Sequence, residues 1–302
     1  GAHNLILIGS PGCGKTLMAG CLPSILPPMS KQESIQTSKI YSVAGKSIGH
    51  CGLLRERPFR APHNSASRIS LLGGGQDAMP GEISLAHNGV LYLDEVTQFS
   101  KGTLDLLRQP LEDGHIVISR LKYRVDYPCE FMFVSSMNPC PCGYYGDPSG
   151  RCTCSQSAVD AYLSRISGPL LDRIDIQIEV PSVPVKDLPT MDPGEPSASI
   201  RKRVLAARAI QSERYAGMPG VHTNADVKSR DLAKVCHFTA KDKENLVRMI
   251  DRLKLSARAY DKVLRVARTI ADLAGSEVVR EEDIQNALCY RRMDEEEHSF
   301  WI

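Results

Sequence analysis

Short apolar runs alternate with longer segments of helical periodicity from Leu5 to about Val180. Four runs have the length and composition of buried strands, namely Leu5 to Ile8, Gly89 to Leu93, Glu130 to Ser135 and Ile174 to Glu179. Buried strands separated by helices are typical of a parallel sheet with helices packed on its faces. The pattern therefore predicts an α/β domain over residues 1–182.

The pattern changes after Val180. Five prolines lie between Val180 and Ser199 among acidic and small residues, and this composition predicts a linker at residues 183–199. Helices are then expected at Ala198 to Tyr215, Ala240 to Leu253, Ala257 to Ala274 and Glu281 to Arg291. Apolar residues recur at helical spacing in the third of these helices, so residues 200–302 are predicted to form a small α-helical domain.

A glycine-rich turn follows the first predicted strand. The sequence Gly9-Ser-Pro-Gly-Cys-Gly-Lys-Thr16 has the spacing of a P-loop and stands between a strand and a helix, as that motif requires. Its backbone N–H groups and the helix N-terminus favour phosphate oxygens. Lys15 can neutralise the β and γ phosphates, and the Thr16 hydroxyl can hold Mg²⁺.

Two acidic residues end the next apolar run, Val90-Leu-Tyr-Leu-Asp-Glu95. Beside a P-loop this pattern indicates a Walker B strand, in which Asp94 holds the metal and Glu95 polarises the attacking water. A third apolar run leads to Asn138, whose amide can orient that water. The expected nucleotide-binding residues are Gly9, Pro11, Gly12, Cys13, Gly14, Lys15, Thr16 and Asp94, with Thr16 and Asp94 as magnesium ligands and Lys15, Glu95 and Asn138 in the reaction.

Phosphoryl transfer also needs positive charge opposite the negative charge that develops, and a neighbouring subunit often supplies an arginine. Arg173 lies where a predicted helix ends before the last strand, a position suited to reaching an adjacent subunit. Arg165, eight residues earlier, is an alternative. Arg258 begins the third helix of the second domain, where it can couple the domain angle to the nucleotide state.

With these residues in order, the chain resembles the AAA+ ATPases, and within them the magnesium-chelatase-like branch that includes the competence protein M (YifB) group. The stretches that carry the resemblance are Phe59-Arg-Ala-Pro-His-Asn64, Gly73-Gly-Gly75, Pro80-Gly-Glu-Ile-Ser-Leu-Ala-His87, Met137-Asn-Pro-Cys-Pro-Cys-Gly143 and Ser167-Gly-Pro-Leu-Leu-Asp-Arg173. The resemblance implies a P-loop AAA+ core with a helical lid, a homo-hexameric ring, Asn138 as first sensor, Arg173 as the finger in trans and Arg258 as second sensor. At Ile174 the chain departs from the more frequent phenylalanine.

The resemblance also assigns two insertions. The segment from Phe59 to about Gly75 resembles the insertion within the second helix, and Gly114 to Tyr127 resembles the hairpin before the sensor strand. Related proteins usually carry an N-terminal Lon-like domain, so we expect this chain to be part of a longer protein.

In that group the implied work is ATP-driven movement on single-stranded or branched DNA, as a helicase or branch-migration motor during recombination of incoming strands. Arg120, Lys122 and Arg124 alternate within the predicted hairpin and are therefore expected to share one strand face. Six such hairpins around a pore would suit phosphates without reading sequence. A solvated hairpin face is the alternative.

Two other functions fit the same motifs. A magnesium-chelatase or MoxR-type ATPase would remodel a protein partner instead of moving on DNA. A nucleotide-gated scaffold would bind ATP and hardly hydrolyse it. Glu95 argues against the scaffold, because a scaffold has no need of an acid that activates water.

Four of the ten cysteines gather between Cys140 and Cys154. They form two Cys-x-Cys pairs, Cys140 with Cys142 and Cys152 with Cys154, separated by a turn-rich segment. Four thiolates on a tight loop can make a tetrahedral structural zinc site. Reduced thiols or disulfides in a loop are the alternative.

Charge and hydropathy bear on the partners and the cellular location of the protein. The 37 Lys and Arg residues nearly balance the 35 Asp and Glu residues, so any DNA contact must be local. No apolar run is long enough to span a bilayer, and no secretory leader opens the chain. These features favour a cytoplasmic protein with no membrane partner.

Overall fold

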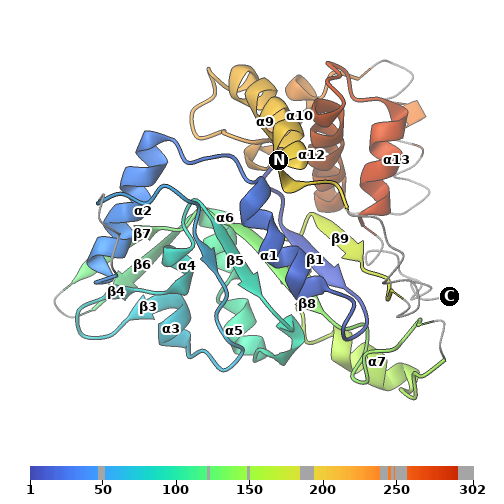
Figure 1. Ribbon diagram of the computed structural model, residues 1–302, viewed down its shortest axis with the longest axis horizontal. Helices are drawn as coiled ribbons and strands as arrows, with labels where there is room; N and C mark the ends of the chain where they lie inside the picture. The colour runs from blue at the N-terminus through green and yellow to red at the C-terminus, as the bar shows by residue number, and fades with distance from the viewer. Residues whose placement is uncertain are drawn as a thin grey trace. The chain divides into compact units, whose positions relative to one another are not determined.

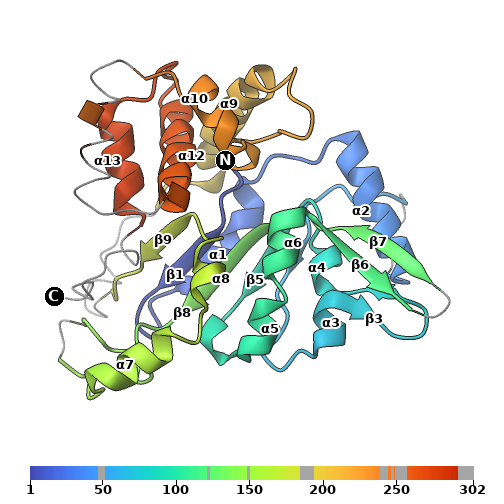
Figure 2. The ribbon, with the colours of Figure 1, turned by 180° about the vertical axis from the view of Figure 1, so that it is seen from behind.

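The computed structural model describes residues 1–46, 52–120, 123–147, 150–183, 194–238, 244–245, 248 and 257–291. The chain forms two compact units, shown from opposite sides in Figures 1 and 2. The α/β unit comprises residues 5–174 and 179–191, and the helical unit comprises residues 1–4, 175–178 and 192–302. The segments 1–4 and 175–178 thus group with the helical unit, although the hydrophobic pattern places them in the first domain.

Five strands form the main sheet in the order β2-β5-β8-β1-β9. Their bounds are β1 Leu5–Ile8, β2 Phe59–Arg60, β5 Val90–Leu93, β8 Met132–Met137 and β9 Ile176–Glu179. The pairs β2–β5, β5–β8 and β8–β1 are parallel. Strand β5 is buried along its whole length, as expected for a parallel sheet covered on both faces. The predicted α/β fold is confirmed, and β2 is an additional strand that the pattern did not indicate.

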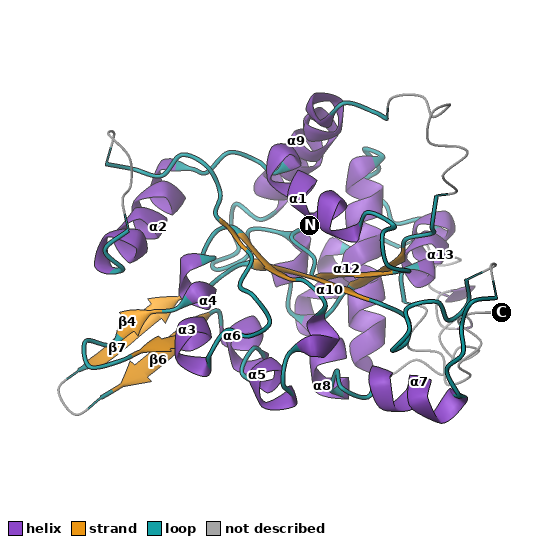
Figure 3. Ribbon diagram, turned by 60° about the horizontal axis from the view of Figure 1, so that its bottom comes forward, coloured by secondary structure: helices purple, strands orange, loops and turns teal. Residues whose placement is uncertain are grey.

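Helices cover both faces of this sheet. In the α/β unit they are α1 Lys15–Ile25, α2 Lys31–Val43, α3 Arg68–Leu72, α4 Glu82–Leu85, α5 Lys101–Asp105, α6 Arg108–Asp113, α7 Gln156–Leu163 and α8 Gly168–Leu171, with the short η1 at Val96–Gln98. Figure 3 views the sheet nearly edge-on, with α1 on one side and α5 and α6 on the other. Because the strands are parallel, the segments that follow β1, β5 and β8 all start at the same edge of the sheet.

Two hairpins lie side by side in the α/β unit (Figures 1 and 2). The first joins β3 Gly73–Gly74 to β4 Met79–Pro80, and the second joins β6 His115–Ser119 to β7 Arg124–Pro128. The Tyr127 hydroxyl donates to the Ala78 carbonyl at 2.9 Å and ties the hairpins together. The pairing of β6 with β7 confirms a hairpin near Gly114 to Tyr127. Strand β2, at the start of the insertion expected from Phe59 to about Gly75, belongs instead to the main sheet.

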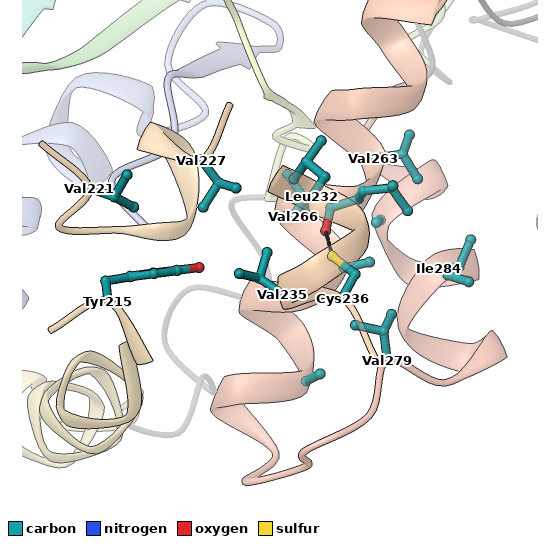
Figure 4. Close-up of a cluster of buried hydrophobic side chains, with 14 residues drawn as sticks. Tyr215, Val221, Val227, Leu232, Val235, Cys236, Val263, Val266, Val279 and Ile284 are labelled. Atoms are coloured by element: carbon teal, nitrogen blue, oxygen red, sulfur yellow. Dashed lines mark hydrogen bonds between the residues drawn. The ribbon is translucent and has the colours of Figure 1, made fainter. Parts of the chain in front are cut away.

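The helical unit contains α9 Ser197–Arg214, η3 Asn224–Asp226, α10 Ser229–Val235, α12 Ala257–Leu273 and α13 Glu281–Cys289. Apolar side chains such as Leu232, Val263, Val266 and Ile284 gather in one buried cluster (Figure 4). The helices expected at the positions of α9, α12 and α13 are confirmed within two residues at each end. Within the described ranges, every helix is too short or too polar to cross a bilayer.

Two expected segments fall largely outside the described residues. Residues 184–193 of the predicted linker are not described, and α9 begins at Ser197, inside the expected linker range. The helix expected from Ala240 to Leu253 is described only at residues 244–245 and 248.

Candidate active site

The P-loop curls between β1 and α1. Gly12 and Gly14 have φ angles of 81° and 89°, a left-handed conformation that glycine adopts without strain. Gly9 lies close to Val180, the residue that follows β9. A Cβ on Gly9 would lie only 2.3 Å from the Val180 carbonyl oxygen. Helix α1 begins directly after this curl, at Lys15, so its positive end faces the loop. The arrangement is a cradle for anionic oxygens.

Lys15 lies over this loop with only 8% of its surface exposed. Its Nζ donates to the Gly9 and Ser10 carbonyls at 2.7 and 2.9 Å, and to Asn138 Oδ1 at 3.2 Å. Asn138 directly follows β8, which pairs with β1. The fold thus brings together the ammonium and the amide that the sequence analysis singled out.

Thr16 and Asp94 form the candidate magnesium site. The Thr16 hydroxyl donates to Asp94 Oδ2 at 3.0 Å, across 78 positions of sequence. Mg²⁺ prefers oxygen ligands and keeps several of its waters, so one hydroxyl and one carboxylate beside a phosphate-binding loop fit it well. The described residues therefore have the right donors for Mg²⁺ at the place where the sequence predicted it.

Asp94 is held by more partners than the sequence suggested. Ser136 Oγ donates to Asp94 Oδ1 at 2.5 Å and the Tyr92 hydroxyl donates to it at 2.8 Å. Burial acts to raise the pKa of Asp94, but the hydrogen bonds from Ser136, Tyr92 and Thr16 outweigh it and lower that pKa below its ordinary value. Asp94 is therefore a carboxylate prepared for a cation.

Sheet register explains this support. Leu93 pairs with Ser135, so the next residues, Asp94 and Ser136, lie opposite each other at the ends of β5 and β8. Tyr92 and Asp94 are two positions apart and so face the same side. The alternation of a strand could have indicated Tyr92 from sequence, but Ser136 could be found only once the pairing was known.

Glu95 adopts an unusual backbone conformation, with φ 49° and ψ 54°. A non-glycine residue in this left-handed region is uncommon, and such residues concentrate at functional sites. Its N–H donates to Ser136 Oγ at 3.0 Å, which anchors the turn, and its side chain is exposed at the sheet edge. The geometry presents a solvent-accessible carboxylate beside the Asp94–Thr16 pair.

The candidate arginines occupy different surroundings. Arg173 Nη2 pairs with Glu112 Oε2 at 2.5 Å. Arg165 is exposed and donates to the Thr97 carbonyl at 3.2 Å. Thr97 is two residues after Glu95 in the sequence. Arg258 is an exposed residue of α12 in the helical unit. Which arginine completes a neighbouring subunit's site stays a prediction.

The four clustered cysteines come together as the spacing predicted. The sulfur atoms of Cys140, Cys142, Cys152 and Cys154 all lie within 4.8 Å of one another. The Cys140–Cys142, Cys140–Cys152 and Cys142–Cys152 sulfur distances are 3.3, 3.8 and 3.6 Å. This set of donors suits a soft metal ion.

Arg120 and Arg124 do not share a strand, so that prediction is wrong. Arg120 follows β6, and its N–H donates to the Tyr123 carbonyl at 2.7 Å. Arg124 begins β7 opposite Ser119. Because residues paired across the ladder share a face and successive residues alternate, Arg124 lies on the Ser119 face and Arg120 on the other. There Arg120 Nε donates to the Gly75 carbonyl at 3.1 Å.

The end of this hairpin nevertheless gathers polar and aromatic groups. We call Arg120, Tyr123 and Arg124 the hairpin tip. All three are exposed, Tyr123 to 48%. Lys122 lies outside the described residues. The exposed aromatic residue beside these cations is a feature that the charge pattern did not indicate.

Similarity to known proteins agrees with this site. Residues 1–188 match the family model for magnesium chelatase, subunit ChlI, and residues 194–291 match the model for its C-terminal part. The chain is 44% identical over 294 residues to competence protein ComM of Haemophilus influenzae and 43% identical over 296 residues to YifB of Escherichia coli. It is 24% identical over 153 residues to the magnesium-chelatase 38 kDa subunit of Cereibacter sphaeroides, 46% of each chain.

These matches differ in extent. The alignments with ComM and YifB cover 97% of this chain but only 56% and 57% of those relatives, so the chain spans little more than half of their length. The match to the ChlI model covers residues 1–188, more than half of the chain. These residues contain the P-loop, the Asp94–Glu95 pair and Asn138. The chain therefore belongs to the magnesium chelatase ChlI family of AAA+ ATPases.

Proposed function

We propose that this protein is a ring-forming ATPase of the cytoplasm that moves on single-stranded or branched DNA during recombination of incoming strands. The observation that carries the proposal is the arrangement of Lys15, Thr16, Asp94, Glu95 and Asn138 at one edge of the sheet. Similarity to a relative named competence protein supports the link to incoming DNA.

Each of these residues has a distinct part in hydrolysis. Lys15 leaves its loop carbonyls to neutralise the β and γ phosphates, while Thr16 and Asp94 would hold Mg²⁺. The ion, when bound, neutralises charge that develops on the phosphate oxygens. Glu95 accepts a proton from the attacking water, and Asn138 orients that water from the adjacent strand.

The proposed assembly is a homo-hexamer. An arginine that completes a neighbour's site makes turnover depend on the ring, and Arg173 is the preferred candidate with Arg165 as the alternative. That contact would require the Arg173–Glu112 pair to open. Arg258 on α12 would sense the nucleotide from the helical unit and couple its position to the hydrolysis cycle.

The hairpin tip is the proposed DNA contact. Cations suit backbone phosphates, and an exposed tyrosine can stack on any base. Arg120 and Tyr123 on one face of the tip and Arg124 on the other would thus contact a single strand that passes around the tip, without reading its sequence. Repeated six times around a ring, the tips would line a basic track whose affinity falls with salt.

One alternative keeps the same ATPase chemistry. The family description and the similarity to the 38 kDa magnesium-chelatase subunit favour an ATPase that remodels a protein partner. Such an enzyme would need the hairpins for protein contacts and would not respond to nucleic acid.

Steady-state ATP hydrolysis by the full-length protein separates the two functions. Turnover is measured without DNA, with single-stranded DNA and with branched DNA, at low and moderate salt, and with Lys15→Ala protein as the background control. DNA stimulation that fades with salt supports the motor. Turnover that is above the Lys15→Ala background but unchanged by DNA would shift the proposal to a protein partner.

A further inference from the structure

A long loop joins β8 to α7. In its described residues, 138–147 and 150–155, the chain forms no helix or strand. Ordering such a segment costs conformational entropy at every residue. Yet Cys140 is fully buried and Gly143 is buried beside it, so the start of the loop is packed, although later residues such as Arg151 are exposed. Something must compensate for the cost of ordering it.

The geometry of the four thiols identifies a compensating element. Zinc bonded to four thiolates at about 2.3 Å in tetrahedral geometry separates the sulfurs by about 3.8 Å. The sulfur separations of 3.3, 3.8 and 3.6 Å among Cys140, Cys142 and Cys152 are close to that value. The Gly143 N–H donates to Cys140 Sγ at 3.2 Å, as a backbone amide does towards a metal-bound thiolate.

Disulfides explain this arrangement less well. A disulfide would bring two sulfurs to about 2.05 Å and leave the other pair apart. Here Cys140, Cys142 and Cys152 are nearly equidistant, and all four cysteines are free thiols. Equal spacing around a common centre fits one ion better than two separate bonds.

The loop contacts the P-loop at two points. Gly143 has a φ of 88° and approaches so closely that a Cβ there would lie 2.6 Å from Pro11 Cδ. Asp147, whose side chain is only 4% exposed, accepts a hydrogen bond from Ser10 Oγ at 3.1 Å. Asn138 directly precedes the first cysteine pair after one proline, and Gly143 and Asp147 lie between the two cysteine pairs in sequence. Fixing the cluster therefore restrains the segment that makes these P-loop contacts.

We propose that Cys140, Cys142, Cys152 and Cys154 bind one structural zinc ion that holds the P-loop in its nucleotide-binding shape through Gly143 and Asp147. Four protein ligands leave no open coordination position, so the ion has no catalytic part. Its binding does not depend on the proposed function, whereas its effect on nucleotide affinity rests on the proposed ATP site.

Metal analysis tests the first half. Full-length protein purified without chelators or added metal should contain about one zinc per chain, and Cys142→Ser and Cys154→Ser should each lose it. Cys289→Ser is the matched control, because this exposed cysteine of α13 lies outside the cluster. Absence of metal, iron in place of zinc, or full zinc content in the two cluster variants would overturn the site.

Nucleotide titration tests the second half. Removal of zinc from the wild type should weaken binding of a fluorescent ATP analogue on the order of 10-fold, and added zinc should restore it. Asp147→Asn keeps the cysteines, so it should retain about one zinc and still bind the analogue more weakly. Unchanged affinity in both the zinc-free protein and Asp147→Asn would refute the link to the P-loop. A zinc-containing protein whose turnover ignores DNA would refute the DNA motor and leave the zinc site standing.

Discussion

The sheet edge that carries Lys15, Thr16, Asp94, Glu95 and Asn138, here called the nucleotide edge, holds its buried side chains in the opposite way to the hairpin tip. At the nucleotide edge, Lys15 is buried and Asp94 accepts hydrogen bonds from three side chains. At the hairpin tip, Arg124 and Tyr123 are exposed to solvent. Groups fixed by neighbours suit chemistry that needs exact placement, and exposed groups suit a ligand that slides.

This difference determines what mutations should do. Changes at the nucleotide edge should alter the rate of hydrolysis or the affinity for Mg-ATP, and they should matter with or without DNA. Changes at the tip should alter DNA binding, depend on salt and leave basal hydrolysis intact. A tip variant that slowed basal hydrolysis would break the comparison.

The largest effect is expected for Arg173→Ala. Loss of an arginine that acts in trans should lower turnover on the order of 10³-fold while ATP binding stays within a few-fold of the wild type. Turnover and analogue binding are measured on the same preparation. Arg108→Ala is the control, since Arg108 is an exposed arginine in a surface pair with Asp105 and should change little.

A mixing experiment decides whether this arginine acts in trans. Arg173→Ala subunits keep an intact P-loop, and Lys15→Ala subunits keep an intact arginine, so mixed rings contain competent interfaces. Activity should therefore return when the two inactive proteins are combined. No recovery, together with a comparable loss in Arg165→Ala, would assign the role to Arg165 instead.

Glu95→Gln should lower turnover by about 10²- to 10³-fold and keep Mg-ATP binding. The amide retains the shape of the side chain but cannot take a proton from water. Single-turnover hydrolysis and analogue titration measure the two properties separately. Normal turnover in this variant would remove Glu95 as the base, and lost binding would indicate that the strained turn, rather than the carboxylate, had been disturbed.

The curl of the P-loop could be predicted from the sequence, because the glycines that this backbone conformation needs are close together in the chain. The run Leu5–Ile8 matched β1 at both ends, and the glycines of the P-loop mark the curl that any phosphate cradle needs. Clustered thiols at short spacing likewise predicted their own proximity. These features depend on local sequence, so no knowledge of strand pairing was required.

The features that the sequence missed depend on pairing instead. Ser136 reaches Asp94 because β8 lies beside β5 in one register, and a serine in an apolar strand carries no mark of that role. Arg120 and Arg124 alternate in sequence, but the chain reverses between them and places them on opposite faces. Strand β2 is only two residues long, which is too short for a periodic signal.

A smaller effect is expected for the double variant Arg120→Ala/Arg124→Ala. Its affinity for single-stranded DNA should fall about 10-fold at low salt, and the slope of log affinity against log salt should become shallower by about 1.4, since two phosphate contacts are lost. Tyr123→Ala should weaken binding without changing that slope, because stacking releases no counterions. Binding is measured by fluorescence anisotropy across a salt series, and basal hydrolysis should stay unchanged.

The matched control for charge is Arg230→Ala/Lys234→Ala, which removes two cations of α10 that are 78% and 74% exposed. It should leave both the affinity and the salt slope unchanged. If the control and the tip variant weaken DNA binding equally, the effect comes from net charge and the tip is not the contact. If neither weakens binding, the DNA contact lies elsewhere on the chain.

The smallest effect is expected for Ser136→Ala, which sharpens the comparison within the nucleotide edge itself. Losing this hydrogen bond to the charged carboxylate should raise the pKa of Asp94 toward its ordinary value, because the bond favours the ionised form. Mg-ATP affinity should fall by only about 3-fold at neutral pH. On acidification, the pH at which this affinity is lost should be higher than in the wild type.

Ser135→Ala provides the control for this variant on the same strand. Ser135 is fully buried, and its hydroxyl has no hydrogen-bond partner among the described residues, so its removal should be neutral or slightly stabilising. Thermal melting of both variants separates folding from metal binding. A pH profile that shifts equally in both would mean that strand packing, not the hydrogen bond to Asp94, sets the carboxylate's affinity for the ion.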